Sequence, residues 1–184
     1  RCEGPESRLC WFLTRMGEVR DPVGTLVFLG TSEFAVPSLE ALVASGETVS
    51  CAVTQPDRPR GRGRRLERSP VAAAAEALGV AVCKPERVNF PSVVADLSGF
   101  GPEFLVVVAY GQLLKAPLLA VPRGGTVNLH ASLLPRHRGP SPVAATIWEG
   151  DSYAGNTTML VDEGLDTGPI LRQEAFPLDP RATR

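Results

Sequence analysis

Short apolar segments alternate with helix-like segments along most of this chain from residue 24 onward. Two apolar runs, Thr25–Leu29 and Phe104–Ala109, predict strands that are buried on both faces, as in the interior of a parallel sheet. The second run is the strongest in the chain, so we expect it to be central. The other predicted strands are shorter and cover residues 49–53, 80–83, 126–130, 156–161 and 170–176.

Helical segments are predicted between most of these strands. Thr31 or Ser32 can cap a first helix that ends at Gly46, and Ser69 followed by Pro70 begins another. Further helices are predicted within residues 86–100, 112–120 and 141–148. This alternation predicts an α/β domain with a doubly wound, mostly parallel sheet. No helix separates the last two strands, which can therefore run antiparallel to the rest.

Length and composition describe an ordinary globular protein. The 184 residues suffice for one domain, and the net charge of −1 gives no general attraction to nucleic acid or to a membrane. No apolar run approaches the roughly 20 residues of a membrane span. The four cysteines show neither a metal-binding spacing nor a paired framework, which favours reduced thiols in a cytoplasmic protein with no metal site.

The two ends of the chain carry expectations about its domain boundaries. Residues 1–15 lack the pattern of a signal peptide, and Met16 stands just before the first convincing strand. We therefore expect residues 1–23 to be an N-terminal extension, not native before Met16, and residues 24–184 to be one domain. The sequence stops soon after the last strand without a closing helix, which predicts a fragment.

The segment 54–68 is rich in proline, glycine and arginine and is predicted to be a loop. Residues 58–68 hold six arginines and one glutamate, a balance of +5. Such a run is either a solvated basic loop or an arm that contacts phosphate through planar guanidinium groups. Charge alone does not decide between the two. The Gly-Lys-Ser/Thr of a phosphate-binding P-loop is absent.

Asn128 and His130 form the main candidate for a chemical site. Residues two apart on a strand share a face, and the carboxyl ends of strands carry the chemistry of open α/β sheets. Asp166, in a glycine-rich turn, is the best partner because a carboxylate raises the basicity of an imidazole and fixes its tautomer. An amide and an imidazole can donate hydrogen bonds to a developing oxyanion. Without a serine or cysteine nucleophile, this set suits group transfer to an incoming amine.

Simpler interpretations of the same residues stay open at this point. A lone histidine such as His130 is more often structural than catalytic, and an aspartate such as Asp166 is usually only a turn residue. Ser132 lacks the glycines of a nucleophile elbow. For His137, between two arginines, a simple surface position is one of the interpretations that stay open. A dinucleotide site after Gly30 is disfavoured because the Gly-x-Gly-x-x-Gly pattern is missing.

Five stretches of the sequence resemble the methionyl-tRNA formyltransferases, which belong to a wider group that transfers a formyl unit from 10-formyltetrahydrofolate. The resemblance runs from about residue 24 to the end and keeps the order of the motifs, which cover residues 28–35, 54–63, 106–111, 128–136 and 164–168. The Asn-x-His and Asp elements and Ser-Leu-Leu-Pro are shared across the wider group. Thr-Gln-Pro-Asp-Arg-Pro with Gly-Arg-Gly is more selective for a tRNA acceptor.

The resemblance implies a Rossmann-like fold and a set of roles. Asn128 and His130 would polarise the formyl carbonyl and handle the proton, and Asp166 would support His130. The folate co-substrate, 10-formyltetrahydrofolate, would contact Ser132, Leu133, Leu134 and Pro135. The end of the initiator methionyl-tRNA would contact Arg58, Arg60, Arg62, Arg64 and Arg65. The expected product is N-formylmethionyl-tRNA for translation initiation, made by a cytoplasmic monomer.

Some features depart from the family pattern and leave alternatives. Family members carry a second, C-terminal β-barrel domain that adds tRNA contacts, and this sequence has no counterpart to it. Ala131 stands where glycine is common, and Arg60 stands where a small residue is common. One alternative is a formyltransferase for a small amine, such as an amino-sugar nucleotide or glycinamide ribonucleotide, which should lack the arginine loop. The other is a non-catalytic binding module of the same fold.

Overall fold

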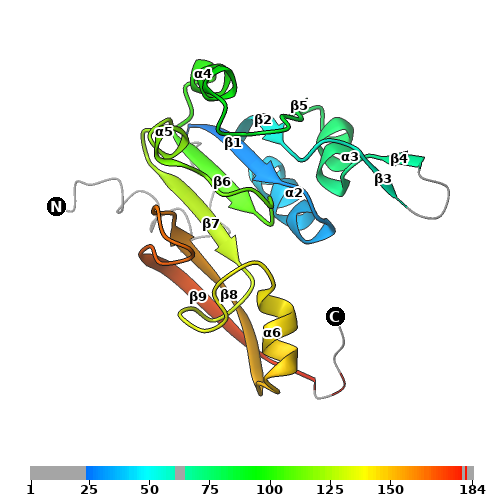
Figure 1. Cartoon of the computed structure of the whole chain (residues 1–184), viewed down its shortest axis with the longest axis vertical. Helices are drawn as coiled ribbons and strands as arrows, with labels where there is room; N and C mark the ends of the chain where they lie inside the picture. The colour runs from blue at the N-terminus through cyan, green and yellow to red at the C-terminus, as the bar shows by residue number, and fades with distance from the viewer. Residues whose placement is uncertain (1–23, 61–64, 180, 182–184) are drawn as a thin grey trace.

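The structure, a computed structural model, describes residues 24–60, 65–179 and 181 and is built on one seven-stranded sheet (Figure 1). The strand order across the sheet is β5-β2-β1-β6-β7-β8-β9. These strands are β1 (Thr25–Gly30), β2 (Thr48–Val53), β5 (Ala81–Cys83), β6 (Phe104–Val108), β7 (Thr126–His130), β8 (Tyr153–Leu160) and β9 (Ile170–Pro177). The pairs among the first five strands in this order are parallel, whereas β7–β8 and β8–β9 are antiparallel.

Helices cover both faces of the parallel part of the sheet. They are η1 (Glu33–Ala35), α2 (Val36–Ala44), α3 (Pro70–Ala77), α4 (Pro91–Gly99) and α5 (Ala116–Leu119), and a further helix, α6 (Pro142–Trp148), follows β7 outside this part. Alternate residues of β1 point to opposite faces, so Val27 and Leu29 pack in one core with α4 and α5, and Phe28 packs in another with α2 and α3. This arrangement confirms the predicted doubly wound, mostly parallel α/β sheet, with β6 at its centre and the last two strands antiparallel.

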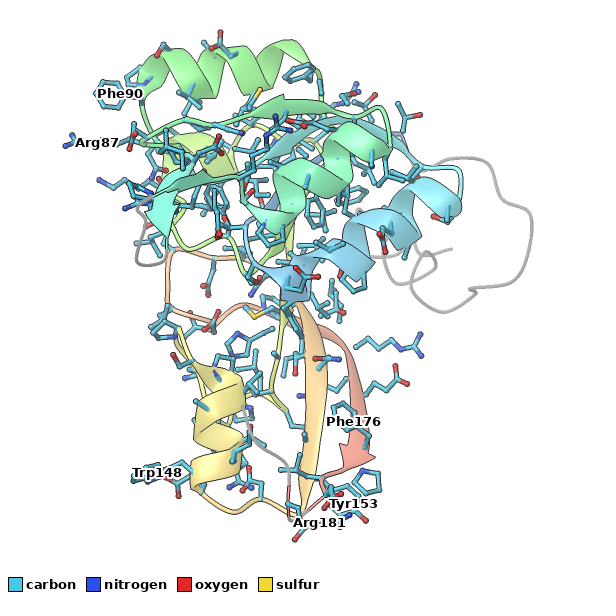
Figure 2. The ribbon with its side chains drawn as sticks, turned by 90° about the vertical axis from the view of Figure 1, so that its right-hand side faces the viewer. Arg87, Phe90, Trp148, Tyr153, Phe176 and Arg181 are labelled. Atoms are coloured by element: carbon cyan, nitrogen blue, oxygen red, sulfur yellow. The ribbon has the colours of Figure 1, made fainter. Side chains whose placement is uncertain are left out.

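The antiparallel strands β8 and β9 form an extension with α6 that projects beyond the parallel part of the sheet (Figure 1). Most residues of β9 are exposed. Leu160 and Leu171 join this extension to a small core cluster of Leu26, Phe104 and Val127. The exposed aromatic side chains of Trp148, Tyr153 and Phe176 lie at its far end (Figure 2).

The basic segment 54–68, predicted to be only a loop, contains a two-stranded antiparallel hairpin. Its strands are β3 (Arg58–Arg60) and β4 (Arg65–Glu67), with Arg58 opposite Glu67. The short strands carry arginine and proline in place of alternating apolar residues, so the hydrophobic pattern gives no strand signal. The turn between them lies outside the described residues.

Two helix starts also differ from the prediction. Within the segment 112–120, only the short α5 forms. Pro117 lacks an amide hydrogen and is tolerated only in the first turn of a helix, so the helix begins at the residue before it. Ser32 occupies the cap position of η1 but makes no side-chain cap bond, and the Thr31 hydroxyl donates to the Tyr110 carbonyl at 2.8 Å instead. Ser69 caps α3 as predicted, since its Oγ accepts from the Ala72 amide at 3.0 Å. Among the described residues, no helix is long and apolar enough to cross a membrane.

Candidate active site

Strand β7 carries Asn128 and His130 to the carboxyl edge of the parallel strands. Asn128 lies between Val107 of β6 and Met159 of β8, and His130 lies opposite Thr157 of β8. The two side chains share a face because they are two residues apart on a strand. His130 is buried and Asn128 is half-buried. Within the described part of the chain, the Asn128 side-chain amide makes no hydrogen bond, so its donors are open to a ligand.

The imidazole ring of His130 lies between two oxygen acceptors. Its Nε2 is 2.9 Å from the carbonyl oxygen of His137, and its Nδ1 is 3.6 Å from Oδ2 of Asp166. A carbonyl oxygen only accepts, so Nε2 carries the hydrogen of that bond. The neutral ring therefore keeps its lone pair on Nδ1, facing the carboxylate. A proton taken up at Nδ1 would give an imidazolium that faces an acceptor at each nitrogen.

Asp166 occupies the tight turn that the sequence predicted. Its backbone is left-handed, with φ of +52°, and its Oδ2 accepts a hydrogen bond from the Gly139 amide at 2.8 Å. A Cβ atom at Gly168 would collide with the Leu160 carbonyl. Asp162, which the sequence analysis did not single out, closes the turn by accepting from the Gly164 amide at 3.0 Å. The turn thus fixes the Asp166 carboxylate beside His130.

Two side chains of the extension hold the turn that follows His130. The Thr157 hydroxyl donates to the Ser132 carbonyl at 2.6 Å and accepts from the Leu134 amide at 3.1 Å. The Gln173 amide donates to the Leu134 carbonyl at 2.7 Å and to the Thr157 hydroxyl at 2.9 Å. Sequence reasoning missed both residues because these contacts span 16 to 39 positions and leave no local pattern.

The four residues expected to contact folate differ in exposure. Ser132 and Leu134 are buried, and the Ser132 hydroxyl donates to the Arg136 carbonyl at 2.7 Å. Leu133 is half-buried and Pro135 is exposed. Only the last two side chains are therefore accessible to a ligand at this turn.

A cleft of about 340 Å³ opens beside this turn, between α6 and the start of β8. Leu133, Arg136, His137 and Asp151 are among its lining residues, and Asn128 and His130 are not. The interpretation of His137 as a simple surface residue is wrong, because its side chain is 11% exposed and its Nε2 is 2.7 Å from Oδ2 of Asp151. The sequence gives no signal for this pair, because His137 precedes α6 along the chain and Asp151 follows it.

Asp151 is held by contacts with Arg136 and His137. Its Oδ1 accepts from Nη2 of Arg136 at 2.6 Å, while its Oδ2 faces the His137 ring. The hydrogen bond from His137, followed by the charge of Arg136, holds the pKa of the Asp151 carboxyl below its usual value.

The basic hairpin leaves the same edge of the sheet as the site, because β2 and β7 are both strands of the parallel part. Arg58 is exposed, and its Nη2 donates to Oε1 of Gln55 at 3.4 Å. The backbones of Arg60 and Arg65 pair in the hairpin, but their side chains lie outside the described residues. Arg62 and Arg64 lie outside them entirely.

Known proteins resemble this chain in sequence and in fold. The sequence profile of the family described as formyl transferase matches residues 25–184. The chain is 45% identical over 154 residues to a methionyl-tRNA formyltransferase of Thermodesulfovibrio yellowstonii, and 49% identical over 158 residues to one of Halorhodospira halophila. These matches cover 84% and 86% of this chain, and the chain spans about half the length of each relative, 50% and 51%.

Solved structures share the fold. A phosphoribosylglycinamide formyltransferase from Bacillus halodurans has a TM-score of 0.70 at 24% identity, over 86% of this chain and 82% of that one. A formyltetrahydrofolate deformylase from Pseudomonas syringae has a TM-score of 0.70 at 17% identity, over 90% of this chain and 54% of that one. At these identities the likeness concerns the fold alone. Since the family profile extends from β1 through the turn that holds Asp166, this chain belongs to the formyl transferase family.

Proposed function

We propose that this chain catalyses transfer of a formyl group from 10-formyltetrahydrofolate to the amino group of initiator methionyl-tRNA. The observation that carries the proposal is the position of His130, beside Asn128 on β7 and 3.6 Å from Asp166, at the carboxyl edge of the sheet. The identity of 45% and 49% to proteins named methionyl-tRNA formyltransferase supports the choice of acceptor. The product is N-formylmethionyl-tRNA for translation initiation.

The chemistry follows from the state of the three side chains. The amine attacks the formyl carbon and forms a carbon–nitrogen bond, and the Asn128 amide donates to the oxygen that becomes negative. His130 takes the amine proton on Nδ1, and the Asp166 carboxylate stabilises the resulting imidazolium. The intermediate collapses by breaking the bond between the formyl carbon and N10 of the folate. His130 then returns the proton to that leaving nitrogen.

The folate donor is proposed to bind at the turn of Ser132, Leu133, Leu134 and Pro135. Leu133 and Pro135 offer accessible apolar side chains for the flat ring system of the folate. Ser132 and Leu134 would contribute through their backbone, because their side chains are buried. The hydrogen bonds that Thr157 and Gln173 donate to the Ser132 and Leu134 carbonyls keep this backbone in place.

The tRNA is proposed to approach along the basic hairpin. Guanidinium groups bind phosphate through paired donors, and phosphate contacts dominate the affinity of proteins for nucleic acids. The arginines assigned to this role are Arg58, Arg60, Arg62, Arg64 and Arg65. A hairpin that leaves the carboxyl edge of the sheet is suited to guide the end of a tRNA toward His130.

The domain organisation is part of the proposal. Residues 24–184 would form the catalytic domain, and residues 1–23 would be an N-terminal extension. The whole protein would carry a C-terminal β-barrel domain with further tRNA contacts and would act as a cytoplasmic monomer. Support comes from the relatives, about half of whose length this chain spans.

A direct assay tests the proposal. The chain, alone and fused to the C-terminal half of the Halorhodospira halophila relative, is supplied with 10-formyltetrahydrofolate and charged initiator methionyl-tRNA. Glycinamide ribonucleotide and an amino-sugar nucleotide serve as rival acceptors, and the His130→Ala variant serves as the inactive control. Formylation of the tRNA, at least by the fusion, is expected.

Other outcomes would change the conclusion in different ways. Transfer to a small amine alone would keep the chemistry of Asn128, His130 and Asp166 and reject the acceptor. A small amine is the acceptor that the name phosphoribosylglycinamide formyltransferase gives for one of the similar structures. A folded fusion that transfers formyl to none of these acceptors would reject the proposed enzyme and favour a binding module.

A further inference from the structure

His137 is held at both its backbone and its ring. Its φ is +56°, a left-handed conformation that few residues other than glycine adopt without support. Its carbonyl oxygen accepts the hydrogen of His130 Nε2 at 2.9 Å, and its own Nε2 is 2.7 Å from Oδ2 of Asp151. The same residue therefore connects the proposed catalytic histidine with a carboxylate outside the proposed catalytic set.

Asp151 is well placed to fix this conformation. Its side chain is 10% exposed, and its backbone amide donates to the Thr146 carbonyl at 3.2 Å, which ties it to the end of α6. Its two carboxylate oxygens bind the consecutive residues Arg136 and His137. A rigid carboxylate that holds two neighbouring side chains also fixes the backbone between them, and with it the direction of the His137 carbonyl.

The direction of this carbonyl determines which nitrogen of His130 carries the hydrogen. Two acceptors compete for it, the His137 carbonyl at Nε2 and the Asp166 carboxylate near Nδ1. With the carbonyl in place, the neutral ring has its hydrogen on Nε2 and its lone pair on Nδ1. If the carbonyl moved away, the carboxylate would attract the hydrogen to Nδ1, and that nitrogen could no longer accept a proton.

We propose that the Asp151–His137 pair is a positioning device that sets the tautomer of His130. It holds the His137 carbonyl against Nε2 and so keeps Nδ1 free to take a proton beside Asp166. The kinetic consequence rests on the proposed formyl transfer, whereas the tautomer is a property of the chain alone. Asp151 and His137 are thus positioning residues that act through His130.

The composition of the chain makes the tautomer directly measurable. His130 and His137 are its only two histidines, so labelling with ¹⁵N-histidine, in a protein without a histidine tag, gives signals from two rings alone. Spectra recorded over a pH titration report which nitrogen of each neutral ring is protonated. The wild-type chain is expected to show His130 in the Nε2–H form.

Two variants remove the pair in different ways. Asp151→Leu deletes the carboxylate, whereas His137→Asn keeps a residue that readily adopts the left-handed conformation but is too short to reach Asp151. Glu76→Gln is the matched control, because it removes a carboxylate that pairs with Arg68 at the surface of α3. Both variants of the pair are expected to transfer a large share of His130 to the Nδ1–H form, and the control is expected to match the wild type.

Kinetics of the same variants in the fusion protein give a second readout. Turnover should fall about tenfold to a hundredfold with little change in KM for the tRNA, which is less than the full value of about 10²–10⁴ for acid–base catalysis. His130 in the Nε2–H form in a folded His137→Asn chain would overturn the inference, even if Asp151→Leu did not fold. A changed tautomer in the two variants, together with a wild-type fusion that transfers no formyl group, would support the inference and reject the proposed function.

Discussion

At the scale of single residues, the proposed chemistry depends on the protons that the ring nitrogens of His130 gain and lose. The His130→Ala variant removes the proposed proton carrier from β7 and leaves the strand pairing with β8 intact. Turnover is expected to fall by about 10²–10⁴, with the fold retained. Formyl-transfer assays of the fusion protein, together with circular dichroism, check this. Near-normal turnover in a folded variant would remove His130 from the mechanism.

Asp151 gives a prediction for the pH dependence of stability. Its pKa is lower in the folded chain than in the unfolded chain, where aspartate side chains titrate at about pH 4. The stabilisation from this group is therefore complete above that pH and is lost as the pH falls through the lowered pKa. The wild type should be more stable than Asp151→Asn at pH 7, and the difference should shrink toward about pH 2. Urea unfolding at the two pH values measures it, and an equal difference at both would contradict it.

The sequence allowed part of the site to be predicted, and the reason is local geometry. Asn128 and His130 share a strand face, and Asp166 follows from a glycine-rich turn after a strand. The partners of the turn after His130 were not predictable, because Thr157 and Gln173 reach it across neighbouring strands. A hydroxyl and an amide on antiparallel strands look like ordinary sheet residues until the strands are paired.

At the scale of elements, the start of α3 connects a helix to the sheet. The Ser69 hydroxyl accepts from the Ala72 amide at 3.0 Å and lies 2.6 Å from the Thr54 hydroxyl at the end of β2. Ser69→Ala removes a buried cap and leaves Thr54 without this partner, so it should cost about 1–3 kcal/mol in the free energy of unfolding. Urea unfolding measures the loss. Ser45→Ala, at the exposed end of α2, is the control and should cost less than about 0.5 kcal/mol.

Most elements were predictable because hydrophobic pattern and capping agree with the fold. The parallel strands β1 and β6 are continuous apolar runs, and their helices begin at proline or end at glycine. The pattern failed for β3 and β4, three of whose six residues are arginine and which pair with each other outside the main sheet. Such a hairpin buries little apolar area, so the hydrophobic pattern carries no information about it.

At the scale of the whole molecule, charge is uneven although the net charge is −1. Replacing Arg58, Arg60 and Arg62 by alanine should weaken tRNA binding and flatten its dependence on salt. Each lost phosphate contact is expected to lower the slope of log K against log salt by about 0.7–0.9. Titrations of the fusion protein with initiator tRNA at several salt concentrations measure the slope.

A matched set of arginines controls for total charge. Arg87, Arg123 and Arg181 are not part of the hairpin: Arg123 and Arg181 pair with acidic side chains, and Arg87 lies over the ring of Phe90. Their replacement by alanine should leave the salt slope nearly unchanged. Equal effects of the two sets would mean that the overall charge, rather than the hairpin, attracts the tRNA.

All three core clusters have their buried residues in the parallel part of the sheet, and the extension of β8, β9 and α6 packs Leu160 and Leu171 against the smallest of them. His130 belongs to the first part, and the residues that fix its surroundings, Thr157 and Gln173, belong to the second. The proposed catalysis would therefore require both parts, although only the first has a large core of its own.

On warming, function should accordingly fail before the fold does. The extension has little apolar contact to hold it, so its amides should exchange with solvent faster than those of β1 and β6. Formyl transfer should decline at temperatures at which circular dichroism still reports a nearly complete fold. Loss of activity and of structure at one temperature would indicate a single cooperative unit. If activity is lost first, the weakest contact between the two parts, not the average stability of the chain, sets the highest temperature at which the proposed enzyme works.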